Sequence, residues 1–155
     1  MNKITPEIFN NFSKIQLPQA YQLGLRAESI GNGRASVRMP FNDISIRPGG
    51  TISGPAMMGL ADFSMYAALM GAIGQVELAV TTSLNINFLR LPTKSDIIAE
   101  CQIMKLGKRL AVLQVTLLSD GDTEPVAHAT GTYSLPPKKK ADIKTFSEKG
   151  AFFKQ

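Results

Sequence analysis

The stretch Arg47–Gly71, RPGGTISGPAMMGLADFSMYAALMG, decides the fold of this chain. A glycine-rich turn opens directly into an apolar helix, and a single carboxylate, Asp62, lies in the middle of that helix. The first amides of a helix have no intrahelical acceptor and lie at the positive end of its dipole, so they favour negative charge. Asp62 has apolar neighbours on both sides, and a buried charge is costly unless it is paired or used. An anion-stabilising turn beside a positioned base is the minimal set of groups for hydrolysing an acyl compound.

The composition is that of one globular domain. The chain has 155 residues, of which 44% are hydrophobic and 19% charged. One cysteine cannot form an internal disulfide, and the N-terminal segment has no continuous apolar run typical of a secretory signal. The apolar run from Ile52 to Val80 is interrupted by Asp62 and several glycines, which favours a buried helix over a membrane span. We therefore expect a cytoplasmic protein without membrane insertion.

The chain is basic, with a formal net charge of +5. Such a charge suits an anionic small molecule, nucleic acid or a membrane surface. Lys138, Lys139 and Lys140 contribute much of it and are typical of a solvated tail. No nucleic-acid-binding motif accompanies them, so we expect an anionic small molecule and no nucleic acid.

Local patterns predict a helix from Pro6 to about Lys14 after Thr5 as N-cap, and a loop at Gln16–Ala20 around Pro18. The long helix should begin after Gly54 and end around Gly71 to Gly74. Six stretches have strand patterns, separated by turn residues: Leu25–Ile30, Arg34–Met39, Ala79–Leu89, Asp96–Lys105, Arg109–Ser119 and Glu124–Ser134.

This order of elements predicts an α+β fold, in which one curved antiparallel sheet of about six strands wraps around the long helix. A helix that is apolar on nearly all sides needs cover all round, and one sheet covers only one side. A second subunit is the natural way to bury the rest, because large exposed apolar patches usually mark interfaces. We therefore expect a homodimer whose sheets join edge to edge, and a dimer of dimers giving a homotetramer.

The same residues resemble a known family, the hotdog-fold thioesterases of the phenylacetic-acid-degradation (PaaI-like) group. The family motif is approximately N-x-x-G-T-x-H-G-G followed by L-A-D, and this chain matches it at Gly50-Thr51, Gly54 and Leu60-Ala61-Asp62. The resemblance divides the chain into an N-terminal helix and lead-in (1–22), a hotdog domain (23–135) and a basic C-terminal tail (136–155).

Three positions depart from the motif: Arg47 replaces Asn, Ser53 replaces His, and Pro55 replaces the second Gly. Proline lacks an N–H, which leaves Gly54 as the favoured oxyanion donor. Ser53 can donate or accept a hydrogen bond but is not a base near neutral pH, so it is either a substrate contact or a turn residue. Arg47 could pair with Asp62 or with a ligand anion.

The resemblance implies a catalytic site. Asp62 would act as general base or as nucleophile, and the Gly54 N–H would bind the thioester oxygen, the two coming from different subunits. Thr81 aligns with a family hydroxyl that holds the attacking water. The alternatives are structural: Asp62 could bond only to core hydroxyls, Gly54 could be a helix N-cap, and Thr81 an ordinary strand residue.

Other residues bear on ligands. His128 is the single histidine, and no cysteine or carboxylate stands at metal-ligand spacing around it, so we expect no metal and no separate cofactor. Cys101 has the pattern of a buried packing residue, and the methionines of the long helix suit a core lining an acyl tunnel. The resemblance would place several cations at the coenzyme A phosphates, namely Arg47, Arg90, Lys105, Lys108 and Arg109. Each of them alone could be a solvated surface residue.

Two functions from different classes follow. The leading hypothesis is hydrolysis of acyl-CoA thioesters to free acid and coenzyme A. The alternative is a non-catalytic acyl-CoA or fatty-acyl binding protein, which the replacements at Arg47 and Ser53 motivate. A purely structural or partner-binding hotdog subunit is the third possibility.

Overall fold

The computed structural model describes residues 3–137, and the cluster of lysines in the predicted tail lies outside them. The helices are α1 (Pro6–Gln16), α2 (Pro18–Gln22) and α3 (Gly54–Ile73). The strands are β1 (Arg26–Gly31), β2 (Arg34–Met39), β3 (Val80–Phe88), β4 (Ile97–Leu106), β5 (Leu110–Ser119) and β6 (Pro125–Ser134).

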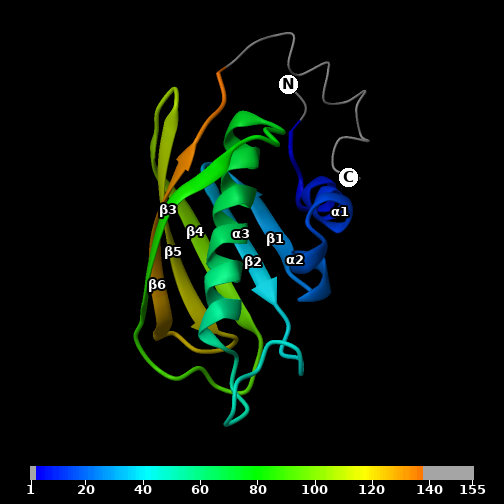
Figure 1. Cartoon of the computed structure of the whole chain (residues 1–155), viewed down its shortest axis with the longest axis vertical. Coiled ribbons are helices and arrows are strands. Elements are labelled where there is room, and N and C mark those ends of the chain that lie inside the picture. The colour runs from blue at the N-terminus through cyan, green and yellow to red at the C-terminus, as the bar shows by residue number, and fades with distance from the viewer. Residues whose placement is uncertain (1–2, 138–155) are drawn as a thin grey trace.

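The six strands form one antiparallel sheet in the order β1-β2-β4-β5-β6-β3. The sheet curves around α3, and α1 and α2 lie beside the β1 end (Figure 1). This arrangement confirms the predicted fold class. Because β3 follows the helix and pairs only with β6, it forms one edge of the sheet, and the β1–β2 hairpin forms the other.

The element boundaries agree with the sequence predictions to within two residues, with one error. The loop predicted at Gln16–Ala20 is wrong, since Pro18–Gln22 is a short helix. Pro18 occupies its first turn, where the missing N–H costs nothing, and Leu17 is the N-cap. A proline can thus begin a helix as readily as it breaks one.

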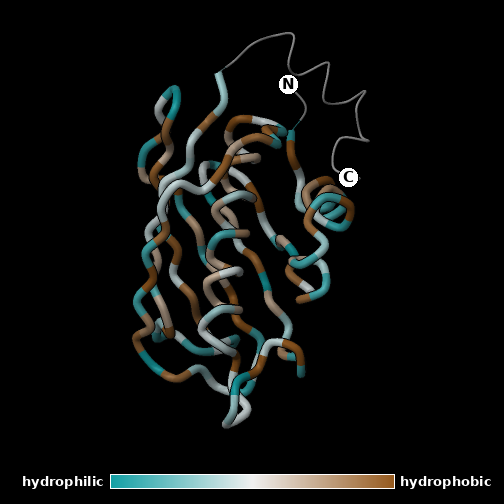
Figure 2. The backbone as a smooth tube through the Cα atoms, in the orientation of Figure 1, coloured by the Kyte–Doolittle hydropathy of each residue, from teal (hydrophilic) through white to brown (hydrophobic). Residues whose placement is uncertain are grey.

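Helix α3 forms the centre of the molecule. Ser53 is its N-cap, so the reading of Gly54 as N-cap is not the arrangement found, and Gly74 ends the helix at a φ of 85°. By length and composition α3 could cross a membrane, but 67% of its most apolar window is buried inside the structure. Figure 2 shows that α3 carries apolar and weakly polar residues along its length, as a core helix does.

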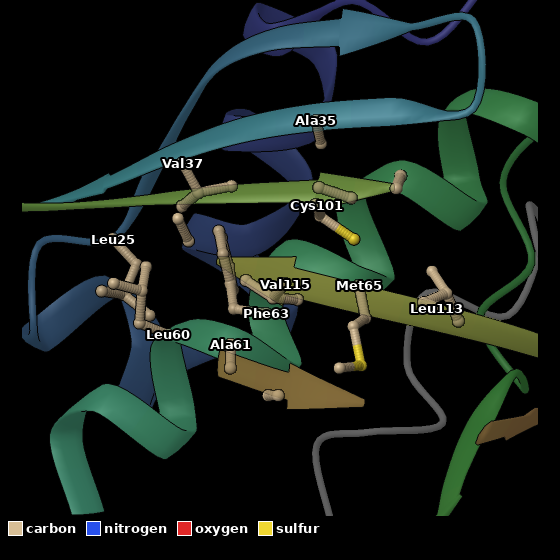
Figure 3. Close-up of a cluster of buried hydrophobic side chains, with 14 of the residues drawn as sticks. Leu25, Ala35, Val37, Leu60, Ala61, Phe63, Met65, Cys101, Leu113 and Val115 are labelled. Atoms are coloured by element: carbon tan, nitrogen blue, oxygen red, sulfur yellow. The ribbon is translucent and has the colours of Figure 1, made fainter. Parts of the chain in front are cut away.

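The core lies between α3 and the concave face of the sheet. Cys101 of β4 and Leu113 and Val115 of β5 are buried on the side of the sheet that faces α3, in the neighbourhood of Met65 (Figure 3). The prediction that Cys101 is a buried packing residue is confirmed. Of the methionines in α3, three are buried core residues, whereas Met58 is 43% exposed.

One side of α3 is left uncovered by the sheet. Pro55, Met58 and Gly59 are exposed on it, and Asp62 is half-buried one turn further on. The adjacent edge strand β3 is also largely exposed, with Val80 and Phe88 at 55% and 50%. The uncovered side of α3 and the edge of β3 together carry the candidate site.

Candidate active site

The Asp62 carboxylate is held by two hydroxyl groups. Thr81 Oγ1 donates a hydrogen bond of 2.6 Å to Asp62 Oδ1, and Tyr133 Oη donates one of 2.6 Å to the same oxygen. Among residues 3–137, no hydrogen bond to Asp62 Oδ2 is formed. One oxygen of the carboxylate is therefore anchored, and the other is available at the uncovered side of α3.

The sheet register brings these two hydroxyls together. Thr81 pairs with Tyr133 across the β3–β6 ladder, so both side chains lie on the face of the sheet toward α3. A register shift between Thr81 and Ser83 marks a bulge at this point, and bulges re-aim neighbouring side chains. Sequence analysis singled out Thr81 but not Tyr133.

Tyr133 is the most deeply buried member of this group, at 3% exposure. Burial, together with the negative charge of Asp62, raises the pKa of Tyr133 well above its usual range. The neighbouring Tyr66 stacks on it with ring centroids 6.4 Å apart, and burial raises the pKa of Tyr66 to about 12. Both phenols therefore stay protonated at neutral pH and serve as hydrogen-bond donors.

The N-terminus of α3 offers one free N–H. The Ala56 N–H donates to Ser53 Oγ at 3.3 Å, and the Met57 N–H donates to the Ser53 carbonyl at 3.1 Å. Pro55 has no N–H. In the described part of the chain the Gly54 N–H makes no hydrogen bond, so it is the one donor of the first turn left for an anion.

Phe88, at the end of β3, packs against Gly54. A Cβ added at Gly54 would lie 3.2 Å from Phe88 Cζ, which is tighter than ordinary van der Waals contact. The two residues border a surface cavity of about 340 Å³, which Arg47, Met57 and Arg90 also line. Glycine at position 54 thus lets an aromatic ring and a donor share one wall of the cavity.

Ser53 lies at this turn in the role of the helix N-cap, with its hydroxyl accepting the Ala56 N–H. Arg47 is exposed in the preceding loop and borders the cavity, on the Gly54 side of the site rather than beside Asp62. The substrate contact of Ser53 and the anion-binding role of Arg47 stay predictions.

The predicted coenzyme A cations fall into two groups at opposite ends of β3. Arg47 and Arg90 lie at the Gly54 end, where Arg90 pairs with Glu124 at 2.7 Å. The other group lies on the β4–β5 hairpin, which projects beyond the sheet at the Asp62 end (Figure 1). It comprises Lys105, Lys108 and Arg109, of which the two lysines have exposed side chains. The Arg109 Nε donates a hydrogen bond to the Leu135 carbonyl at 2.9 Å.

Within residues 3–137, no three histidine, cysteine or carboxylate side chains come close enough together to hold a metal ion. The His128 Nε2 lies 3.3 Å from Gln114 Oε1 on the convex face of the sheet, away from Asp62. The described residues of the site are therefore a carboxylate, two hydroxyls, a backbone N–H and cations.

Comparisons with known proteins agree with this arrangement. Residues 49–126 match the sequence model of the family described as "Thioesterase superfamily". The chain is 30% identical to a "putative esterase" of Thermoplasma volcanium over 70% of this chain and 80% of the relative.

Solved structures include a "putative thioesterase" of Silicibacter sp. TM1040, with 35% identity and a TM-score of 0.79 over 86% of this chain and 93% of that one. Another is a mutant of the phenylacetic acid degradation protein PaaI from Thermus thermophilus. It shows 25% identity and a TM-score of 0.68 over 77% of this chain and 99% of that one.

Proposed function

The chain belongs to the thioesterase superfamily, and on that basis we propose that it hydrolyses acyl-CoA thioesters to the free acid and coenzyme A. One observation carries this proposal: the free Gly54 N–H and the Asp62 carboxylate lie along the one side of α3 that the sheet leaves uncovered. Spacings of four residues, from Gly54 through Met58 to Asp62, place them on one face of the helix.

In the proposed reaction, the Gly54 N–H stabilises the negative charge that develops on the thioester oxygen. Asp62 either takes a proton from the attacking water or attacks the carbonyl carbon itself through Oδ2. In the first route water attacks the carbonyl carbon, and the C–S bond breaks to expel the coenzyme A thiolate, which takes the proton held by Asp62. In the second route the thiolate leaves as Asp62 forms a mixed anhydride. Water then cleaves the anhydride to release the acid and regenerate Asp62, and a proton from that water passes to the thiolate. Thr81, bonded to Asp62 Oδ1, can still accept a hydrogen bond from that water.

The two groups cannot act on one carbonyl within a single chain. Asp62 lies eight positions after Gly54 in the helix, which is about 12 Å along the axis. A reacting carbonyl group must lie within about 3.5 Å of both its nucleophile and its oxyanion donor. We therefore propose that each site combines Gly54 of one subunit with Asp62 of another.

The free edge of β3 supports such a dimer. Natural edge strands are usually protected by charges, proline or short length, whereas β3 has nine residues and none of these. The other edge, β1, carries Arg26 and Glu28. A second copy of β3, paired antiparallel about a two-fold axis, would complete the sheet.

The register of that pairing follows from the contacts within one chain. Asp62 is bonded to Thr81 near the start of β3, and Gly54 lies against Phe88 at its end. Antiparallel pairing centred near Leu84 and Asn85 sets the start of one β3 beside the end of the other. It also brings the cations at the Gly54 end of one chain near those of the β4–β5 hairpin of the other.

The experiment is a thiol-release assay over short-chain, medium-chain, long-chain and aryl acyl-CoA substrates. Wild type should hydrolyse at least one of them, and Asp62→Asn should lower kcat on the order of a hundredfold or more. Glu7→Gln on the exposed surface of α1 is the matched control for loss of a carboxylate. Tight binding of intact acyl-CoA without turnover by wild type would favour a binding protein instead.

The PaaI-like subtype, the cytoplasmic location and the tetramer belong to the same proposal. Their support is the motif match at Gly54 and Asp62, the burial of α3 within the fold and the exposed sheet surfaces. The hydrolysis panel addresses the subtype through any preference for aryl substrates.

A further inference from the structure

Tyr133 lies outside the family motif described above, yet its hydroxyl contacts Asp62. Its Oη lies 2.6 Å from Asp62 Oδ1 and 3.0 Å from the Asp62 backbone carbonyl, and the shorter contact is the stronger hydrogen bond. We infer that Tyr133 is a positioning residue: together with Thr81 it fixes Asp62 Oδ1, so that Oδ2 alone faces the attacking water or the reacting carbonyl. This inference rests on the function proposed above.

The physical need for such an anchor lies in the aspartate side chain. Rotation about the last side-chain torsion of Asp is broad and roughly two-fold, so an unanchored carboxylate presents either oxygen in many orientations. Two donors on one oxygen remove this freedom. Since misplacement of a reacting group by about 1 Å can cost a hundredfold in rate, the anchor bears directly on kcat.

Tyr133 is itself held rigidly by its neighbours. Its ring stacks on Tyr66 at an interplanar angle of 14°, and Tyr66 packs against Phe9 and Phe12 of α1. The Tyr66 hydroxyl reaches the Val76 and Glu77 carbonyls at 3.4 and 3.3 Å. An aromatic column thus runs from α1 through α3 to β6 and ends at the Tyr133 hydroxyl.

The role of the hydroxyl is to donate and to keep its proton. Burial and the nearby Asp62 charge both oppose ionisation of the phenol, so Tyr133 stays a donor at neutral pH. No atom of Tyr133 is transferred in the reaction. Its contribution is to the orientation of Asp62 in the transition state, and substrate binding should not depend on it.

The test compares kcat and KM of wild type, Tyr133→Phe and Tyr66→Phe on the best acyl-CoA substrate. Both variants keep the aromatic column and lose one hydroxyl. The Tyr66 hydroxyl bonds to the Val76 and Glu77 carbonyls and not to the Asp62 carboxylate, so Tyr66→Phe is the matched control. We expect Tyr133→Phe to lower kcat about 10- to 100-fold with KM within about twofold, and Tyr66→Phe to stay within about twofold.

A double-mutant cycle adds a second readout. Thr81→Val and Tyr133→Phe act on the same oxygen, so their combined effect on kcat should differ from the product of the single effects. A thermal melt of each variant identifies any that does not fold.

A crystal structure of wild type with an unreactive thioether analogue of acyl-CoA tests the inference without any substitution. We expect Oδ2 to face the ligand while Oδ1 stays within hydrogen-bond distance of Tyr133. The inference would be overturned if Oδ1 contacted the ligand, or if the Tyr133 hydroxyl donated a hydrogen bond directly to the ligand.

The kinetic outcomes separate the inference from the function on which it rests. Full kcat in Tyr133→Phe, with activity lost in Asp62→Asn, would overturn the role of Tyr133 and leave the proposed function intact. An equal loss in Tyr133→Phe and Tyr66→Phe, or a change in KM alone, would also overturn it. Full activity in Asp62→Asn, or no hydrolysis by wild type, would overturn the proposed function and the inference together.

Discussion

Gly54 and Asp62 lie on the same side of α3, two turns of helix apart, and that side is the one the sheet leaves uncovered. Each is supported by its own end of β3: Phe88 packs against Gly54, and Thr81 bonds to Asp62. The spacing that prevents them from meeting within one chain allows them to meet across a two-fold axis. The predictions below follow from this relationship.

Gly54→Pro should abolish the oxyanion donor without breaking the helix. Proline suits the first helical position, and Ser53 already has the extended backbone that a following proline requires. Loss of one such donor costs about 100- to 1,000-fold in kcat. Gly54→Ala is the matched control, because it adds the same Cβ against Phe88 but keeps the N–H. Equal losses in the two variants would show that crowding, not the donor, is responsible.

A charge on the free edge of β3 should dissociate the dimer. Asn85→Lys would place two like charges near the proposed two-fold axis, which destabilises pairing. Light scattering should show the 16.8 kDa single chain for this variant and at least twice that mass for wild type. Ser29→Lys on the opposite edge strand is the control and should stay associated. A wild-type monomer that hydrolyses acyl-CoA would contradict both the assembly and the shared site.

Removal of hairpin cations should weaken binding of the nucleotide part of the substrate. We expect Lys108→Ala to raise KM for acyl-CoA about fivefold, the upper end of what one solvent-exposed ion pair contributes. KM for an acyl-N-acetylcysteamine thioester, which has no phosphates, should not change. Lys14→Ala on α1, where the ammonium lies over the Tyr21 ring, is the control. An equal rise in KM for both substrates would argue against phosphate binding.

Much of the fold could be predicted because its signals are local. Proline and glycine mark the ends of α3, and alternation along Leu84, Ile86 and Phe88 marks β3. The short helix at Pro18–Gln22 was missed, since a lone proline signals a helix start and a loop equally well.

The site was predictable only in part for a different reason. Gly54, Asp62 and Thr81 stand in motif positions, but Tyr133 lies on β6, which pairs with β3 across a sheet order that differs from the order along the chain. A threonine-tyrosine pair in a late strand has no distinctive pattern. Only the β3–β6 register shows that its hydroxyl reaches Asp62.

The stability of the fold should depend on pH through Asp96. The hydrogen bond that the Asp96 carboxylate accepts from the Phe41 N–H lowers its pKa below the usual 3.8, and so does the ion pair with Arg38. Arg38 also pairs with Glu28 and Asp120. A carboxyl whose folded pKa is depressed stabilises the protein above its unfolded pKa, and this contribution is lost as the pH falls through the folded value.

The free energy of unfolding of Asp96→Asn should therefore be lower than that of wild type near neutral pH. The difference should begin to shrink as the pH falls below about 3.8, the ordinary pKa of the group, and vanish once the pH is below the lowered pKa of the folded state. Urea melts of both proteins at descending pH measure it, with Asp43→Asn in an exposed loop as control. A difference that persists unchanged into acid would show that Asp96 acts through its shape and not its charge.

The most direct test of a shared site is complementation between two inactive chains. Asp62→Asn and Gly54→Pro are produced separately, unfolded and refolded together in equal amounts. Each mixed dimer would contain one site with both substitutions and one with neither, so random pairing should restore about a quarter of wild-type activity. The shared site would be contradicted if mixed dimers were shown to be present but the activity of the mixture did not exceed the summed activities of the two separate variants.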